Sequence, residues 1–241
     1  MEINSTKTVR ELTIEIPGAT RVFEKLGIDY CCSGGKTFQQ ACDDAGVSTD
    51  EVAQTLGKAG KPDSQDERSI EWQFRPLSEL TSYIVAKHHD FTRNELSRLN
   101  ALLSKVCWAH GQNHPELLRL QRLIKELTYD LIPHMHKEEV ILFPFISQLE
   151  TAASTGTRTA IPFFGTVQNP IQMMMIEHEK AGDILAQIRQ VTGSFLVPED
   201  GCLSYQTLYN ALKSLEQDLH QHIHLENNIL FPRAIEMEGL D

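Results

Sequence analysis

The sequence predicts an all-α protein with a small N-terminal helical domain followed by a four-helix bundle. Four long segments with apolar residues at helical spacing fill the C-terminal two-thirds of the chain. Before them, the chain begins with short helical patterns that have capping residues, followed by a polar segment containing glycine and proline. The expected domains are residues 1–60 and 75–241, with a linker at residues 61–74.

The N-terminal domain contains four short helical patterns. Apolar residues at 9–16 precede Pro17, which suits the first position of a helix, and that next helix is expected to end at Gly27. A third pattern covers residues 38–45. A capping-box sequence opens the fourth, at residues 48–56.

The bundle is predicted from four longer patterns, each opened by proline or serine. Their approximate ranges are 76–106, 115–149, 170–191 and 204–237. The first and second helices, and the third and fourth, are joined by short connections that favour antiparallel neighbours. Such a bundle can bring inward-facing side chains from all four helices to one level, where metal sites are commonly built.

Composition excludes several classes of partner. The chain has 22 Lys and Arg against 33 Asp and Glu, a net charge of −11, so binding to nucleic acid is not expected. Its start lacks the features of a signal peptide, and the apolar stretch 140–146 is too short to span a bilayer. Five cysteines at irregular spacing favour reduced thiols. We therefore expect a cytoplasmic protein without a membrane partner.

An internal repeat carries the strongest functional signal. Residues 134–144 and 222–232 both read H-x-H-x-E-x-x-I-L-F-P. In each copy the first His and the Glu are four residues apart, so they share one helix face and can bind the same metal centre. These residues are His134 and Glu138 in the first copy, and His222 and Glu226 in the second.

A weaker repeat adds one histidine from each of the other two helices. His89 and His178 are each followed by an acidic residue and precede the two copies of the motif by nearly the same number of residues. His88 is the adjacent competitor, and we prefer His89 because its His-acid step matches that of His178. The expected ligands are then four imidazoles and two bridging carboxylates, a set that suits iron or manganese better than structural zinc.

The remaining histidines are expected to lie on the surface or in loops. The middle histidines of the motif, His136 and His224, lie about 200° round the helix from the first. His220 is expected to face away for the same reason. Asp130 and Glu177 lie close to ligand histidines, where each is expected either to hydrogen-bond an imidazole or to face solvent.

Adjacent cysteines form the second candidate site. Cys31 and Cys32 lie in a glycine-containing turn before a predicted helix, and they cannot easily form a mutual disulfide. Backbone amides in such a turn are expected to lower a thiol pKa and favour the reactive thiolate. The alternative is that both are small apolar residues filling a tight turn.

Taken together, these motifs resemble the Repair of Iron Centres family. The resemblance rests on D-Y-C-C-x-G-G at residues 29–35, the duplicated H-x-x-x-E bundle, and L-E-N-N-I-L-F-P-R at residues 225–233. It implies an ScdA-type N-terminal domain, a hemerythrin-like bundle and two non-haem iron ions per chain, bridged by oxo and carboxylate groups. The family's ligand positions fall on the six residues deduced above, and its cysteine pair falls on Cys31 and Cys32.

The resemblance also implies repair of iron–sulfur clusters damaged by nitric oxide or peroxide, with iron supplied to the damaged protein. Two alternatives stay open: a di-iron nitric oxide reductase or peroxidase, and a sensor of diatomic gases. The expected partners are damaged iron–sulfur proteins, and nitric oxide or oxygen species at the di-iron site. Cys31 and Cys32 are assigned to transfer or docking. Because about sixty residues make a marginal domain, we expect the small domain to dock on its own bundle or to form a homodimer.

Overall fold

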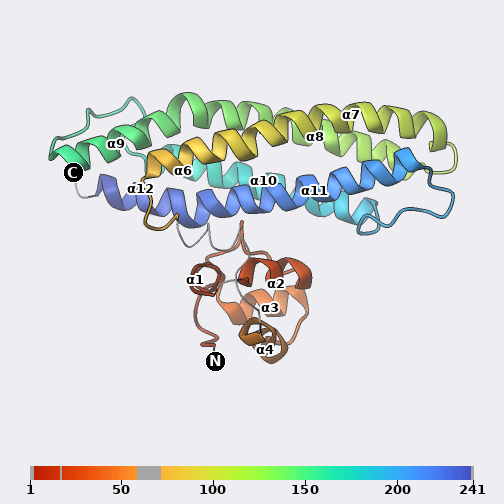
Figure 1. Ribbon diagram of the computed structural model, residues 1–241, viewed down its shortest axis with the longest axis horizontal. Coiled ribbons are helices and arrows are strands. Elements are labelled where there is room, and N and C mark those ends of the chain that lie inside the picture. Colours follow the sequence, from red (N-terminus) through yellow and green to blue (C-terminus); the bar gives the residue numbers. More distant parts are fainter. Residues whose placement is uncertain (1–2, 17, 59–71, 240–241) are drawn as a thin grey trace.

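The computed structural model describes residues 3–16, 18–58 and 72–239. Within these ranges the chain is helical and has no β-strand, only one isolated bridge between Thr8 and Thr37. Figure 1 shows a long bundle with the small domain, α1 to α4, lying against one side of it. The predicted all-α class is confirmed. No helix in the described ranges is long and apolar enough to cross a bilayer.

Short helices build the N-terminal domain. They are α1 (Val9–Glu15), α2 (Ala19–Leu26), α3 (Phe38–Ala45) and α4 (Thr49–Lys58). Thr8 and Thr37 each form a capping box at the start of α1 and α3. Gly27 and Gly46 end α2 and α3 with φ of 71° and 67°, the left-handed conformation that glycine adopts without strain. Pro17 lies outside the described residues.

The bundle contains the four predicted helices, three of which are interrupted by a π-helical turn. The α-helical segments are α6 (Leu77–Ile84), α7 (Asp90–His110), α8 (Glu116–Lys137), α9 (Phe143–Thr155), α10 (Gln168–Val191), α11 (Leu203–Leu225) and α12 (Phe231–Glu238). The π turns are η1 (Val85–His89), η2 (Glu138–Leu142) and η3 (Glu226–Leu230). The sequence analysis did not predict π turns, so they are a correction to the expected bundle helices.

The repeated proline gives a physical reason for two of these turns. In η2 the amide of Phe143 donates to the carbonyl of Glu138, five residues earlier. Pro144 follows, and in a regular α-helix its ring would clash with the carbonyl of Val140. Pro232 occupies the same place after η3. The wider turn avoids the clash, so the I-L-F-P part of the motif also shapes the backbone beside each glutamate.

Three apolar clusters form the interior. One lies among α7, α8, α10 and α11, and a second involves mainly α6, α9, α12 and the segments beside them. The third is the core of the small domain, and it includes Ile223 from α11. The small domain therefore buries part of its apolar surface against the bundle. Most of the predicted linker, residues 61–74, lies outside the described residues, and the domain boundaries stay predictions.

Candidate metal centre

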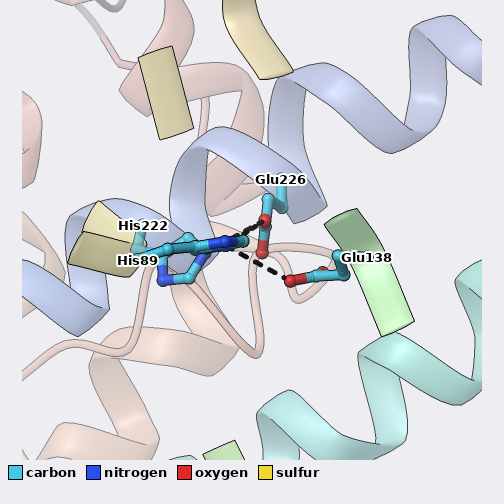
Figure 2. Close-up of side chains that lie close together, drawn as sticks. All are labelled: His89, Glu138, His222 and Glu226. Atoms are coloured by element: carbon cyan, nitrogen blue, oxygen red, sulfur yellow. Dashed lines mark hydrogen bonds and ion pairs between the residues drawn. The ribbon is translucent and has the colours of Figure 1, made fainter. Parts of the chain in front are cut away.

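The six predicted ligands converge between the apolar clusters of the bundle. Each is at most 2% exposed. They form two groups of four that share Glu138 and Glu226: one group adds His89 and His222, and the other adds His134 and His178. Figure 2 shows the first group, in which both imidazoles point toward the two carboxylates. Within each group the candidate donor atoms lie within 4.8 Å of one another.

Spacing of the donor atoms fits a pair of metal ions. The Nε2 atoms of His89 and His222 are 3.1 Å apart, and those of His134 and His178 are 3.0 Å apart. Two nitrogens bound at right angles, each about 2.1 Å from one ion, would be separated by about 3.0 Å. Neither carboxylate oxygen of Glu138 has a hydrogen-bond donor among the described residues, so lone pairs remain for a cation.

The buried carboxylates of Glu138 and Glu226 would be stabilised by positive charge between them. Burial, followed by the charge of Glu226, raises the pKa of Glu138 to about 8. Burial also acts to raise the pKa of Glu226, but the imidazoles of His222 and His178 hold that pKa well below its usual range. Two ionised carboxylates are costly in a water-excluded interior, and a bridged pair of divalent cations would offset that cost. The nitrogen and oxygen donors suit iron.

Two of the ligand imidazoles contact a carboxylate through Nδ1, the ring nitrogen that faces away from the metal centre. His89 Nδ1 lies 2.7 Å from Glu139 Oε1, which also accepts a hydrogen bond from Arg93. His134 Nδ1 lies 2.8 Å from Glu177 Oε2. Such contacts fix the tautomer in which Nδ1 carries the proton and Nε2 is free to bind metal. The sequence had left the role of Glu177 open and had not identified Glu139.

Asp130, the other acidic candidate, lies elsewhere. Its carboxylate pairs with Lys180 at 2.7 Å. It therefore makes a partly exposed ion pair between α8 and α10 rather than contacting a ligand imidazole.

His178 is held by an amide instead. Its Nδ1 lies 2.9 Å from Asn227 Oδ1. Asn227 and Glu139 occupy the same position of the repeat, directly after the bridging glutamate. The position therefore has the same function in both halves, and comparing the two copies could have identified it. His222 Nδ1 has no hydrogen-bond partner among the described residues.

Not all the remaining histidines lie where the sequence predicted. His88 does not join the donor groups; it is buried with Nδ1 3.1 Å from Asp218, and its neighbour His89 lies in the cluster. His136 is exposed, as expected. His88 and His224 are both buried, so their assignment to the surface or to loops is wrong. His220 and His224 both make edge contacts with the ring of Tyr30, because the small domain covers this face of the bundle.

The cysteine turn is organised by Asp29, which sequence reasoning missed. Its carboxylate accepts hydrogen bonds from the amides of Cys31, Cys32 and Ser33 at 3.0, 2.9 and 3.1 Å. Those amides are thus not available to a thiolate. The Cys32 thiol, burial and the charge of Asp29 raise the pKa of Cys31 well above its ordinary value. The expected lowering of a thiol pKa by the turn is wrong for Cys31.

This turn docks directly beside the metal centre. Asn227 Nδ2 donates to the carbonyl of Cys31 at 3.1 Å, while Oδ1 of the same amide holds His178. Asn228 Nδ2 donates to the carbonyl of Tyr30 at 2.9 Å. Cys32 Sγ lies 3.5 Å from the carbonyl oxygen of His178. One asparagine therefore joins the thiol turn to a candidate metal ligand.

Comparison with known proteins agrees with this arrangement. Residues 80–234 match the model described as "Hemerythrin HHE cation binding domain", and residues 5–60 match ScdA_N, a "Domain of Unknown function (DUF542)". The chain is 34% identical over 226 residues to "Iron-sulfur cluster repair protein YtfE" of Escherichia coli O81 (strain ED1a), covering 93% of this chain and 94% of that protein. Proteins of the same name from Escherichia coli O127:H6 and Escherichia fergusonii show the same identity and coverage.

These matches confirm the hemerythrin-like bundle that the sequence predicted. The hemerythrin match, together with the two His/Glu groups, also confirms the predicted di-iron cofactor.

Proposed function

Because the chain belongs to the family of iron–sulfur cluster repair proteins, with an ScdA-type domain followed by a hemerythrin domain, we propose that it restores damaged iron–sulfur clusters by supplying iron. The observation that carries this proposal is the sparse donor set. Each group contains two imidazoles and two carboxylates, and both carboxylates are shared. An ion held this way keeps open coordination positions and lacks thiolate ligands, so it can be exchanged.

The geometry supports the following residue roles. We assign His89 and His222 to one ion, His134 and His178 to the other, and Glu138 and Glu226 to both. Two iron ions bound there would supply exchangeable Fe²⁺ and positions for small ligands. Glu139, Glu177 and Asn227 orient the imidazoles, and the apolar clusters at either end exclude water.

Cluster repair can be tested with a hydratase whose iron–sulfur cluster has been damaged by nitric oxide. The iron-loaded protein is mixed with the damaged enzyme in the presence of a chelator that captures free Fe²⁺. We expect recovery of hydratase activity, and none from an equal amount of Fe²⁺ under the same chelator. The matched control is the double variant Glu138→Ala/Glu226→Ala, which removes both shared carboxylates. Recovery no greater than that given by free iron would contradict donation.

A second candidate function is reduction of nitric oxide or peroxide at the metal pair. It is favoured by the proximity of the two groups, since two ions that share both carboxylates could hold two small ligands side by side. With an external electron donor in excess, the protein should then convert two nitric oxide molecules, two electrons and two protons into nitrous oxide and water over many turnovers. Stoichiometric binding without turnover would exclude this activity. In either function the targets or ligands are damaged iron–sulfur proteins, nitric oxide or oxygen species.

A further inference from the structure

We propose that Asp29, Cys31 and Cys32 form a second metal site, separate from the dinuclear centre, which binds one thiophilic divalent cation. We call it the thiol site. Its donor atoms are the two sulfurs and Asp29 Oδ1, and they lie within 4.8 Å of one another. The site stands on its own geometry. Only the further statement, that its ion in the cell is Fe²⁺ passing from the dinuclear centre, rests on the proposed function.

Separations within the turn match a tetrahedral metal site. The two Sγ atoms are 3.7 Å apart, and Cys31 Sγ lies 3.5 Å from Asp29 Oδ1. Thiolates bound tetrahedrally at about 2.3 Å would be about 3.8 Å apart, and a carboxylate oxygen at about 2.0 Å would lie about 3.5 Å from each sulfur. The amides of the turn hold the Asp29 carboxylate beside the two sulfurs.

A cavity gives the thiol site access to solvent and a favourable charge. It has a volume of about 380 Å³ and lies between the small domain and the helices α10 and α11. Both cysteines line it, and so do Asp29, Glu179 and Asp183, which favour entry of a cation. Gly182 faces the thiols: a Cβ at this position would lie 3.3 Å from Cys32 Sγ. The missing side chain leaves room beside the sulfur.

The thiol site is also adjacent to the dinuclear centre. Cys32 Sγ lies 3.5 Å from the carbonyl of His178, and Asn227 contacts both His178 and Cys31. The thiol site and the dinuclear centre therefore share His178 and Asn227 as neighbours. Binding needs no change of oxidation state: the cation displaces one proton from each thiol, two metal–sulfur bonds form, and two protons pass to solvent.

Cobalt titration of the intact protein tests the thiol site. The iron-loaded chain is titrated with Co²⁺ without oxygen, and its iron content is followed throughout. We expect about one cobalt per chain, a thiolate-to-cobalt charge-transfer band, and release of about two protons in weak buffer. Cys31→Ser and Cys32→Ser should each reduce the band at least tenfold. Absence of the band, or an unchanged band in both variants, would overturn the thiol site.

Cys202→Ser is the matched control, because Cys202 is an exposed thiol outside the cavity. It should leave the cobalt band unchanged. A measurement on the unmodified chain guards against misfolded variants: bound Co²⁺ should slow alkylation of Cys31 and Cys32 at least tenfold, as mapped by peptide mass spectrometry. The alkylation rate of Cys202 should not change. Equal alkylation rates with and without cobalt at all three cysteines would count against the thiol site.

The transfer role is separated from the site itself by the cluster-repair assay. If the unmodified protein binds cobalt at the cysteines but repairs no clusters, the proposed function fails and the thiol site stands. If Cys31→Ser and Cys32→Ser lose the cobalt band but repair clusters at the full rate, the passage of iron through the thiol site is overturned. Loss of both cobalt binding and repair, with the dinuclear iron retained, supports transfer.

Discussion

At the scale of single residues, the ligand imidazoles differ in what holds them. Glu177 has its pKa lowered to about 2, chiefly by its hydrogen bond with His134, so it is ionised at neutral pH. Burial acts to raise the pKa of Glu139, but hydrogen bonds from Arg93 and His89 lower it overall. An imidazole whose Nδ1 donates to a carboxylate is a stronger metal ligand than one whose Nδ1 donates to an amide oxygen. His89 and His134 should therefore bind their ions more strongly than His178, which contacts the Asn227 amide.

These contacts give the first prediction. Glu139→Gln and Glu177→Gln keep a hydrogen-bond acceptor but remove the charge, and each should weaken iron binding about 10- to 100-fold. The measurement is competition for Fe²⁺ with chelators of graded affinity. Glu126→Gln, an exposed change on α8, is the control and should bind iron like the unmodified chain. Equal affinity in all three variants would show that the outer carboxylates do not support the ligands.

At the scale of elements, the two copies of the repeat differ where the small domain docks. Val140 in η2 is exposed, whereas its counterpart Asn228 in η3 is buried. Asn228 donates to the carbonyl of Tyr30, contacts His224 Nδ1 at 2.8 Å and accepts a hydrogen bond from Arg10 Nε at 2.9 Å. The same turn thus supports a metal ligand in both halves and binds the small domain in only one.

The second prediction concerns this asparagine. Asn228→Ala leaves a buried carbonyl and an arginine without their partner, which should cost about 1–3 kcal/mol of docking free energy. Hydrogen exchange in α1 to α4 should become faster, while the iron content is unchanged. Val140→Ala, at the equivalent position of the other repeat, should change neither quantity. If the two variants exchange alike, the Asn228 contacts do not hold the domain in place.

Sequence reasoning succeeded where the pattern is local or repeated. The bundle helices follow from apolar periodicity, and the six converging side chains follow from H-x-x-x-E and its partner histidines. Asn227 could have been found in the same way, since it matches Glu139 in the repeat. Asp29, Asn228 and the burial of His224 could not, because they depend on how the small domain lies against the bundle. That docking follows from tertiary packing, which single-sequence patterns do not encode.

At the scale of the whole molecule, the small domain covers two histidines that are not candidate ligands: His224 is buried and His220 is half-buried. Burial lowers the pKa of His224 to about 4, with a smaller effect from Arg10, and Tyr30 and Asn228 also contact the ring. Burial likewise lowers the pKa of His220 to about 4, opposed by Asp29. The docked arrangement therefore needs both rings neutral.

The last prediction is that acid loosens the docked domain through these rings. When the domain opens, His224 regains its ordinary pKa near 6.5 and takes up a proton that the docked form excludes. The stabilisation is complete above about pH 6.5 and is lost as the pH falls toward about 4. Between pH 7.5 and 5.5 the loss from His224 alone should be about 1.3 kcal/mol, or about tenfold faster hydrogen exchange through opening of α1 to α4 after correction for intrinsic rates. His224→Gln cannot ionise and should lose less protection, whereas the exposed control His136→Gln should behave like the unmodified chain. An equal loss of protection in the two variants would mean that His224 does not couple docking to pH.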